Sequence, residues 1–232
     1  MRYRALLLDL DGTLADTAAD LGAALNALLL EEGRAALPPE RIRPVASDGA
    51  RGLLSLGFAV SHEDARFAGL RERLLDAYMA RIAAETRLFD GMQTLLARVA
   101  EAGMHWGIVT NKPTWLTEPL MSALAVEPPA ACVVCGDTAE HAKPHPAPLL
   151  HAARAIGCAP QECLYVGDAA RDIEAAIAAG MPALVAGWGY LPEDDDPGRW
   201  GAQAILASPE ALRQWLSPHL AMSRTDTVSG HG

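Results

Sequence analysis

The sequence predicts an α/β protein: a doubly wound parallel sheet with a small all-helical cap inserted after the first strand. From residue 88 onward, short apolar runs alternate with helical patterns, which is typical of a parallel sheet with crossover helices. The first apolar run, Ala5 to Leu8, is separated from this region by residues 15–87, which show only helical patterns. We therefore expect a core domain of residues 1–14 and 88–221, a cap of residues 15–87 and a loose tail of residues 222–232.

The first strand leads directly into an acidic turn, Asp9-Leu-Asp-Gly-Thr-Leu14. Because side chains alternate in direction along a strand, the carboxylates of Asp9 and Asp11 point the same way. Two negative charges held that close are costly unless a cation or a shared proton compensates them. Mg²⁺ suits this position, since proteins bind it through one or two carboxylates together with a substrate phosphate.

The cap region is expected to begin with a helix that Asp16 or Thr17 caps. A polar, glycine-rich turn at residues 47–52 precedes a second, short helical stretch. A Ser-x-x-Asp pattern then resembles a capping box and predicts a long amphipathic helix over residues 61–84.

The alternating region predicts four more strands and five helices. The expected strands are residues 106–110, 131–135, 164–167 and 183–186, and the expected helices are 92–102, 114–124, 146–156, 171–179 and a last one that Ser208 caps. Cys132 and Cys135 have C-x-x-C spacing, but a second such pair is missing. We interpret the four cysteines as small buried apolar residues.

Composition excludes several classes of partner. The 232 residues are 50% hydrophobic and 21% charged, an ordinary globular composition. Acidic residues outnumber basic ones 29 to 19, and the net charge of -10 argues against nucleic acid or an anionic membrane surface as a partner. No apolar run is long enough to span a bilayer, and the one before Asp9 is too short for a signal peptide. We expect a cytoplasmic protein, either a monomer or a dimer.

Polar side chains follow several predicted strands at the point where each strand ends, and one more lies in a later loop. They are Asp9, Asp11, Thr110, Asn111, Lys143 (in the loop), Asp168 and, one helical turn further on, Asp172. The carboxyl ends of strands in such a sheet lie at one edge, where ligands bind. We therefore expect these groups to converge.

This set of groups is suited to phosphoryl transfer. One aspartate can attack phosphorus and carry an aspartyl-phosphate, while a second protonates the leaving oxygen and later activates water. Mg²⁺ held by the carboxylates would neutralise the nucleophile and the phosphate together. Thr110 and Lys143 would bind the non-transferred phosphoryl oxygens. The expected partner is a small phosphorylated metabolite.

Four segments together resemble the four motifs of the haloacid dehalogenase superfamily. They are Asp9-Leu-Asp-Gly-Thr-Leu14, Val109-Thr-Asn111, Lys143-Pro144 and Gly167-Asp168-x-x-x-Asp172. The resemblance implies that Asp9 is the nucleophile and Asp11 the general acid/base. It also implies that Thr110, Asn111 and Lys143 bind phosphate. Mg²⁺ would be bound by Asp9, the backbone carbonyl of Asp11 and Asp168, with Asp172 supporting these ligands.

Within the superfamily, the sequence is similar to phosphoglycolate phosphatases and to the related N-acetylmuramic acid 6-phosphate phosphatases. The segments Phe89-Asp-Gly-Met92 and 106–113 contribute to this likeness. The resemblance implies a phosphatase acting on 2-phosphoglycolate or on N-acetylmuramic acid 6-phosphate. Both compounds carry a carboxylate, with which Arg51 of the cap would pair.

Two alternatives remain open at this point. A sugar-phosphate mutase retains all four motifs and passes the phosphoryl group to a sugar rather than to water. A phospho-accepting signalling module also uses an acidic metal site with a Thr and a Lys, but is about half this size and has no helical insert after the first strand. Sustained turnover distinguishes the signalling module from an enzyme.

Overall fold

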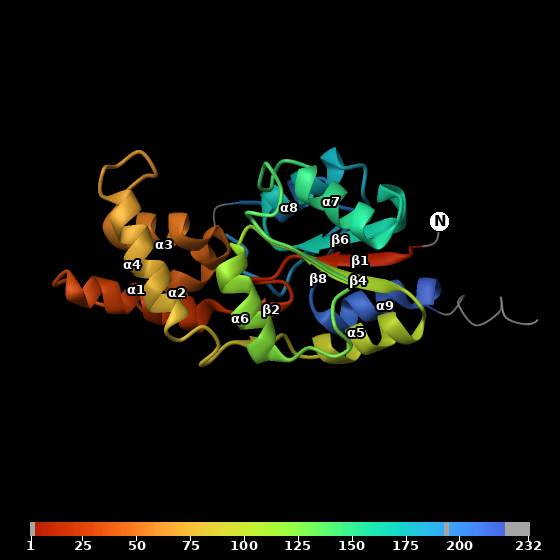
Figure 1. Ribbon diagram of the computed structural model, residues 1–232, viewed down its shortest axis with the longest axis horizontal. Helices are drawn as coiled ribbons and strands as arrows, with labels where there is room; N and C mark the ends of the chain where they lie inside the picture. The colour runs from red at the N-terminus through yellow and green to blue at the C-terminus, as the bar shows by residue number, and fades with distance from the viewer. Residues whose placement is uncertain (1–2, 193–194, 221–232) are drawn as a thin grey trace, which may run out of the picture.

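The structure is a computed structural model that describes residues 3–192 and 195–220. Its centre is a six-stranded parallel sheet in the order β5-β4-β1-β6-β7-β8 (Figure 1). The strands are β1 (Ala5–Leu8), β4 (His105–Val109), β5 (Cys132–Val134), β6 (Cys163–Gly167), β7 (Ala183–Ala186) and β8 (Ala204–Leu206). From β1 the chain adds β4 and β5 on one side and the last three strands on the other, so the strand order reverses beside β1. Ligands of such sheets bind at this reversal, outside the carboxyl ends of the strands.

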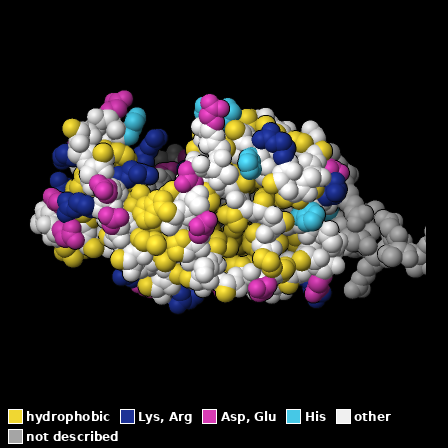
Figure 2. Space-filling view, viewed as in Figure 1, with side chains coloured by type: hydrophobic (Ala, Val, Ile, Leu, Met, Phe, Trp, Pro, Cys, Tyr) yellow, Lys and Arg dark blue, Asp and Glu magenta, His cyan; other side chains and the backbone are white. Residues whose placement is uncertain are grey.

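A helical layer, the cap, is inserted between β1 and β4 and lies beyond one end of the sheet (Figure 1). Its elements are α1 (Ala18–Glu31), α2 (Pro39–Ile42), a 3-10 helix η1 (Arg43–Asp48), α3 (Gly49–Phe58) and α4 (Phe67–Met79). They bury an apolar core of their own, which includes Leu25, Leu53 and Leu74. The molecule is hollowed where the cap meets the sheet domain (Figure 2). This arrangement confirms the predicted fold class, with its inserted helical cap.

Two short strands mark the passage between cap and core. β2 (Ala15–Asp16) pairs antiparallel with β3 (Arg87–Leu88). Beside them, the fully buried carboxylate of Asp20 accepts hydrogen bonds from the N–H groups of Glu85 (3.0 Å) and Thr86 (2.8 Å), and from the Thr86 hydroxyl (2.8 Å). The two crossings are thereby bonded to each other. We propose that the cap begins and ends at this pair, at the predicted residues 15 and 87.

Helix α1 is capped only partly as predicted: of the two expected caps, the Asp16 carboxylate accepts a long hydrogen bond from the N–H of Ala18 at 3.4 Å. Thr17 occupies the N-cap position, but its side chain makes no capping hydrogen bond. The first N–H groups of the helix, those of Thr17 and Ala18, donate instead to the hydroxyl of Tyr190 at 2.6 and 3.0 Å. A residue of the core domain thus satisfies the backbone of the first cap helix.

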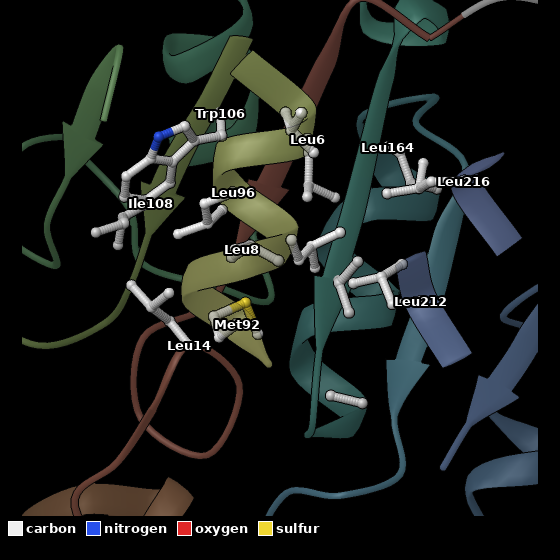
Figure 3. Close-up of a cluster of buried hydrophobic side chains, with 14 of the residues drawn as sticks. Leu6, Leu8, Leu14, Met92, Leu96, Trp106, Ile108, Leu164, Leu212 and Leu216 are labelled. Atoms are coloured by element: carbon white, nitrogen blue, oxygen red, sulfur yellow. The ribbon is translucent and has the colours of Figure 1, made fainter. Parts of the chain in front are cut away.

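Helices cover both faces of the sheet. α5 (Met92–Glu101) and α9 (Pro209–Leu220) pack on one face, which receives Leu6 and Leu8 (Figure 3). α7 (Ala147–Ile156) and α8 (Ala170–Ala178) pack on the other face, which receives Leu7. This division follows from the alternation of side chains along β1. α6 (Thr114–Leu124) joins the layers, since its Leu120 packs with the core and its Leu116 with the cap.

The structure corrects several details of the predicted elements. The helix expected over 61–84 is shorter, because residues 61–66 form turns and α4 covers only Phe67–Met79. β5 is an edge strand in which Val133 is 41% exposed, so the run at 131–135 is not a fully buried strand. β2, β3, β8 and two 3-10 helices, η2 (Pro160–Glu162) and η3 (Pro197–Arg199), are short elements that were not predicted. Residue 221 and the predicted tail at 222–232 lie outside the described residues. Within the described part, no helix is long and apolar enough to cross a membrane.

Candidate active site

A cavity of about 550 Å³ lies at the carboxyl ends of the strands, between the sheet and the cap. It contains most of the side chains that were predicted from the sequence to form the site. Asp9, Asp11, Arg51, Thr110, Asn111 and Lys143 line it. Asp168 and Asp172 lie behind this wall, fully buried and close to Asp9. The expected convergence of distant segments is therefore present.

Lys143 is the centre of charge compensation in the site. Its ammonium lies 3.0 Å from Oδ1 of Asp9 and 2.7 Å from Oδ1 of Asp172, and it donates to the hydroxyl of Tyr165 at 2.8 Å. The side chain is 1% exposed, and burial alone would lower its pKa. The charges of Asp172 and Asp9 outweigh this effect, so the pKa of Lys143 lies above its usual range. The lysine therefore remains a cation.

Asp9 is buried at the end of β1, where the N–H of Leu10 donates to its Oδ1 at 2.7 Å. Burial raises the pKa of Asp9 to about 6, although Lys143 acts in the opposite direction. The negative charges of Asp172 and Asp11 add to the increase. The charge of Lys143 thus does not fully offset the burial of Asp9 and the charges of its neighbours.

Asp168 follows β6 and is held by groups from three separate segments. Its Oδ2 accepts hydrogen bonds from the Ser47 hydroxyl of the cap (2.6 Å) and from the N–H of Tyr190 (2.8 Å). The hydroxyl of Thr13 lies 3.4 Å from its Oδ1. Burial, with the charges of Asp9 and Asp172, raises the pKa of Asp168 to about 7.

The three buried carboxylates fit a divalent cation. Asp9, Asp168 and Asp172 each offer an oxygen, and these atoms lie within 4.8 Å of one another. A donor set made only of oxygen atoms is the kind that hard cations such as Mg²⁺ or Ca²⁺ select. A bound dication would also oppose the burial and the repulsion between carboxylates that raise the pKa values of Asp9 and Asp168.

Gly12 lets the backbone approach this cluster. Its φ of +80° lies in the left-handed region, and a Cβ at this position would lie 2.0 Å from Oδ2 of Asp168. A side chain at residue 12 would therefore push the carboxylate aside. The close approach and the positive φ explain why the acidic turn has glycine at residue 12.

Asp11 points to a different set of partners from Asp9. Its Oδ1 accepts a hydrogen bond from the Thr17 hydroxyl (2.6 Å) and lies 3.0 Å from the ammonium of Lys112. The hydroxyl that was expected to cap α1 thus binds an acidic side chain of the site.

Thr110 and Asn111 follow β4 and have different surroundings. Thr110 is buried in the cavity wall, and its hydroxyl accepts a hydrogen bond from the N–H of Lys112 at 3.1 Å. The Asn111 amide donates to the carbonyl of Lys143 and accepts from its N–H, each at 2.9 Å. Asn111 therefore orders the loop that carries Lys143. Its predicted contact with phosphate stays a prediction.

The cap supplies the outer wall of the cavity. Arg51 and Arg71 line it from α3 and α4, and neither side chain forms an ion pair within the described residues. Next to them, Asp48 pairs with Arg171 of the core at 2.7 Å, and Arg171 also donates to the carbonyl of Ser47. The glycine-rich turn is thus anchored over the site. Arg51 is placed where it can meet a bound molecule.

Several contributors to the site were not assigned a role there from the sequence, among them Ser47, Lys112, Tyr165 and Tyr190. Tyr165 interrupts an otherwise aliphatic buried strand, which is a weak signal for a buried polar partner. Its hydroxyl lies 3.2 Å from Oδ1 of Asp172 and donates to the Val109 carbonyl at 3.0 Å. Lys112 follows the Thr-Asn pair in the chain, but no pattern indicates its partners.

Comparison with known proteins places the chain among hydrolases. A sequence model described as haloacid dehalogenase-like hydrolase matches residues 6–186. A phosphoglycolate phosphatase of Xanthomonas campestris pv. campestris is 46% identical over 222 residues, which cover 94% of this chain and 100% of that protein. An N-acetylmuramic acid 6-phosphate phosphatase of Pseudomonas putida is 39% identical over 220 residues, which cover 95% and 99%. A solved structure of a predicted phosphoglycolate phosphatase from Haemophilus somnus 129PT has a TM-score of 0.81 at 22% identity, covering 93% of this chain and 98% of that one. The last similarity concerns the fold alone.

Proposed function

The chain belongs to the haloacid dehalogenase-like hydrolase family and is a phosphoric monoester hydrolase, and we propose that it is a Mg²⁺-dependent phosphatase acting through an aspartyl-phosphate on Asp9. The observation that supports this most strongly is the ammonium of Lys143 between the carboxylates of Asp9 and Asp172, at the floor of a cavity. Such an ammonium can offset the charge of an incoming phosphate and of the acyl-phosphate that forms.

In the proposed first step, a carboxylate oxygen of Asp9 attacks phosphorus, and the bond between phosphorus and the leaving oxygen breaks. Asp11 gives its proton to that oxygen. In the second step, Asp11 takes a proton from a water molecule whose oxygen attacks phosphorus. The bond between phosphorus and the Asp9 oxygen breaks, which releases inorganic phosphate and restores the Asp9 carboxylate. Thr110 and Lys143 bind the non-bridging oxygens of the phosphoryl group, which carry its negative charge.

Asp9, the backbone carbonyl of Asp11 and Asp168 would hold Mg²⁺, with Asp172 supporting them. When bound, the metal lowers the repulsion between the anionic nucleophile and the anionic phosphate. Ser47 and the N–H of Tyr190 would keep Asp168 in place, since both donate to it. The cap contact at Ser47 and Asp48 would help to exclude water from the reacting groups.

For the substrate, we propose a small phosphate monoester whose leaving group carries a carboxylate, either 2-phosphoglycolate or N-acetylmuramic acid 6-phosphate. Arg51 lines the cavity without an anionic partner and would pair with that carboxylate. The volume of about 550 Å³ exceeds what a two-carbon leaving group needs. It supports the amino sugar as the larger of the two candidates.

The test is phosphate release by the purified protein with Mg²⁺, comparing the two compounds side by side. A kcat/KM at least tenfold higher for N-acetylmuramic acid 6-phosphate would support the amino sugar. The opposite ratio would support 2-phosphoglycolate. Whichever compound is preferred, the variant R51M should raise its KM, because Arg51 would pair with the carboxylate that both compounds carry. Absence of phosphate release from both, and from p-nitrophenyl phosphate, would contradict the proposed function.

A further inference from the structure

Lysine is rare in this chain and is confined to the site. The sequence has 19 lysine and arginine residues together, and Lys112 and Lys143 are its two lysines. Both line the cavity. Every other basic residue is arginine, which has a larger and planar head group. The compact ammonium of Lys112 therefore stands out in this chain, as that of Lys143 does.

The two lysines have parallel surroundings. Lys143 lies against Asp9, and its ammonium is 5.5 Å from the centroid of the Tyr165 ring. Lys112 lies 3.0 Å from Asp11, and its ammonium is 4.5 Å from the centroid of the Tyr78 ring and 3.3 Å from the Tyr78 hydroxyl. Each of the two aspartates of the acidic turn therefore has its own lysine and tyrosine.

The two pairs differ in where their tyrosine comes from. Tyr165 belongs to β6 in the core, whereas Tyr78 belongs to α4 in the cap and is fully buried. The side chain of Lys112 is 6% exposed, so it is enclosed between Asp11 and the cap helix. A cation over an aromatic face is attracted to it, and more strongly where both are desolvated. The position of the Lys112 ammonium therefore depends on the cap.

The contacts of Asp11 leave one of its oxygens available. Lys112 and the hydroxyl of Thr17 both bind Oδ1. Within the described residues, Oδ2 accepts no hydrogen bond, and Asp11 lines the cavity. Two donors on one oxygen fix the rotation of a carboxylate, so they determine where the other oxygen lies.

We propose that Lys112 is a positioning residue for Asp11: its ammonium, held by Tyr78 of the cap, fixes Oδ1 and thereby presents Oδ2 to the leaving oxygen of the substrate. This inference rests on the proposed role of Asp11 as general acid and base. Proton transfer by Asp11 then becomes dependent on α4 lying against the core. Direct binding of phosphate is the competing role for Lys112, and a purely structural link between cap and core is another.

The first experiment measures how the effect of K112M depends on the leaving group. Single-turnover rates, with enzyme in excess and Mg²⁺ saturating, are compared for p-nitrophenyl phosphate and for the alkyl phosphate that the wild type hydrolyses faster. A nitrophenolate leaves without protonation, whereas an alkoxide needs it. We expect the rate to fall roughly 10- to 100-fold on the alkyl phosphate and at least several-fold less on p-nitrophenyl phosphate. KM should change less than about threefold.

An equal loss on both substrates, or a loss confined to KM, would overturn the proposal. Thermal unfolding identifies a variant that fails to fold, in which case K112Q, which keeps a hydrogen-bond donor, replaces K112M in the same measurement. If the wild type releases no phosphate from any of the three compounds, the proposed function fails instead. The two failures are therefore distinct.

The second experiment is a double-mutant cycle with D11N. If Lys112 acts through Asp11, the D11N/K112M protein is no slower than D11N within about twofold. Losses that multiply would overturn the proposal.

Y78L and its matched control Y78F test the cap contact, because phenylalanine keeps the aromatic face. Y78L should reproduce the leaving-group dependence of K112M and Y78F should show less of it; wild-type dependence in Y78L would contradict the role of the cap.

Discussion

The ammonium of Lys143 lies 3.0 Å from Asp9 and 2.7 Å from Asp172, so one cation joins two buried carboxylates. Removing it leaves both anions uncompensated and removes a ligand for the phosphate. We expect K143M to lower kcat/KM by about 10²- to 10³-fold. K143R should recover little, because a planar guanidinium does not fit a site that is 1% exposed. Steady-state phosphate release by the two variants checks this, and near-normal activity of K143M would contradict it.

The carboxylate cluster predicts stabilisation by metal. Mg²⁺ at a hundredfold excess over its Kd should raise the free energy of unfolding by about 2.7 kcal/mol, which corresponds to several degrees in Tm. D168N should lose most of this increase, because it removes a carboxylate from the set Asp9, Asp168 and Asp172. Calorimetry with and without Mg²⁺ measures the increase in both proteins.

Removal of the metal should stop catalysis. An excess of chelator should abolish turnover, and undiminished rates would contradict the assignment of the metal.

Gly12 offers a backbone test of the same cluster. In G12A the new Cβ would meet Oδ2 of Asp168 at 2.0 Å, at a φ of +80° that alanine tolerates poorly. We expect the variant to lose turnover and the Mg²⁺-dependent rise in Tm together. G103A is a matched control, since Gly103 has a φ of +72° and no atom within 4 Å of the added Cβ. If G12A retained both properties, the close approach of turn and carboxylate would have no functional meaning.

Asp20 predicts a pH dependence of stability at the junction of cap and core. Burial alone would raise its pKa, but hydrogen bonds from Glu85, Thr86 and Arg81 outweigh this and lower the pKa below its ordinary value of 3.8. A carboxyl with a lowered folded-state pKa stabilises the fold above its unfolded-state pKa and loses that contribution as the pH falls through the folded-state value. D20A should therefore cost about 1–3 kcal/mol for each donor left unsatisfied at pH 7.

The difference in unfolding free energy between wild type and D20A should shrink as the pH falls below about 4. Urea unfolding at a series of pH values measures it. A difference that does not depend on pH would show that the ionised form of Asp20 is not what holds the junction.

Periodicity and turn residues were enough to predict the architecture. The strand Ala5–Leu8 is a continuous apolar run because helices cover both faces of the sheet, and such runs between glycine stops identify buried parallel strands. β8 escaped prediction because it is three residues long and only half-buried. The strands β2 and β3 have two residues each, too few for any periodicity.

The candidate site likewise has residues that the sequence indicates and partners that it does not. Asp9, Thr110 and Asp168 belong to short linear patterns that follow strands, and Lys143 to a Lys-Pro pair in a loop, so the sequence indicates them. Their partners come from packing between distant segments. Tyr78 reaches Lys112 from the cap, and Tyr190 reaches α1 from a loop 172 or more residues away. No local pattern encodes such contacts, because they depend on how the cap lies against the sheet.

The capping of α1 illustrates why a correct residue can receive the wrong role. Thr17 is a suitable N-cap by residue type. Its hydroxyl nevertheless binds Asp11 at 2.6 Å, because the Tyr190 hydroxyl already satisfies the first N–H groups of the helix. A charged acceptor forms the stronger hydrogen bond, and a tertiary contact thus overrides the local preference.

In the proposed mechanism, Asp9 carries the phosphoryl group. D9N should keep the fold, since asparagine has nearly the same shape, and should release no phosphate. The most direct measurement is reduction by borohydride of acid-quenched enzyme during turnover, followed by mass spectrometry of the peptide around residue 9. An acyl-phosphate on Asp9 is reduced to the alcohol, so we predict homoserine at this position in wild type and not in D9N. Turnover with an unmodified Asp9, or with the modification on another aspartate, would contradict the account.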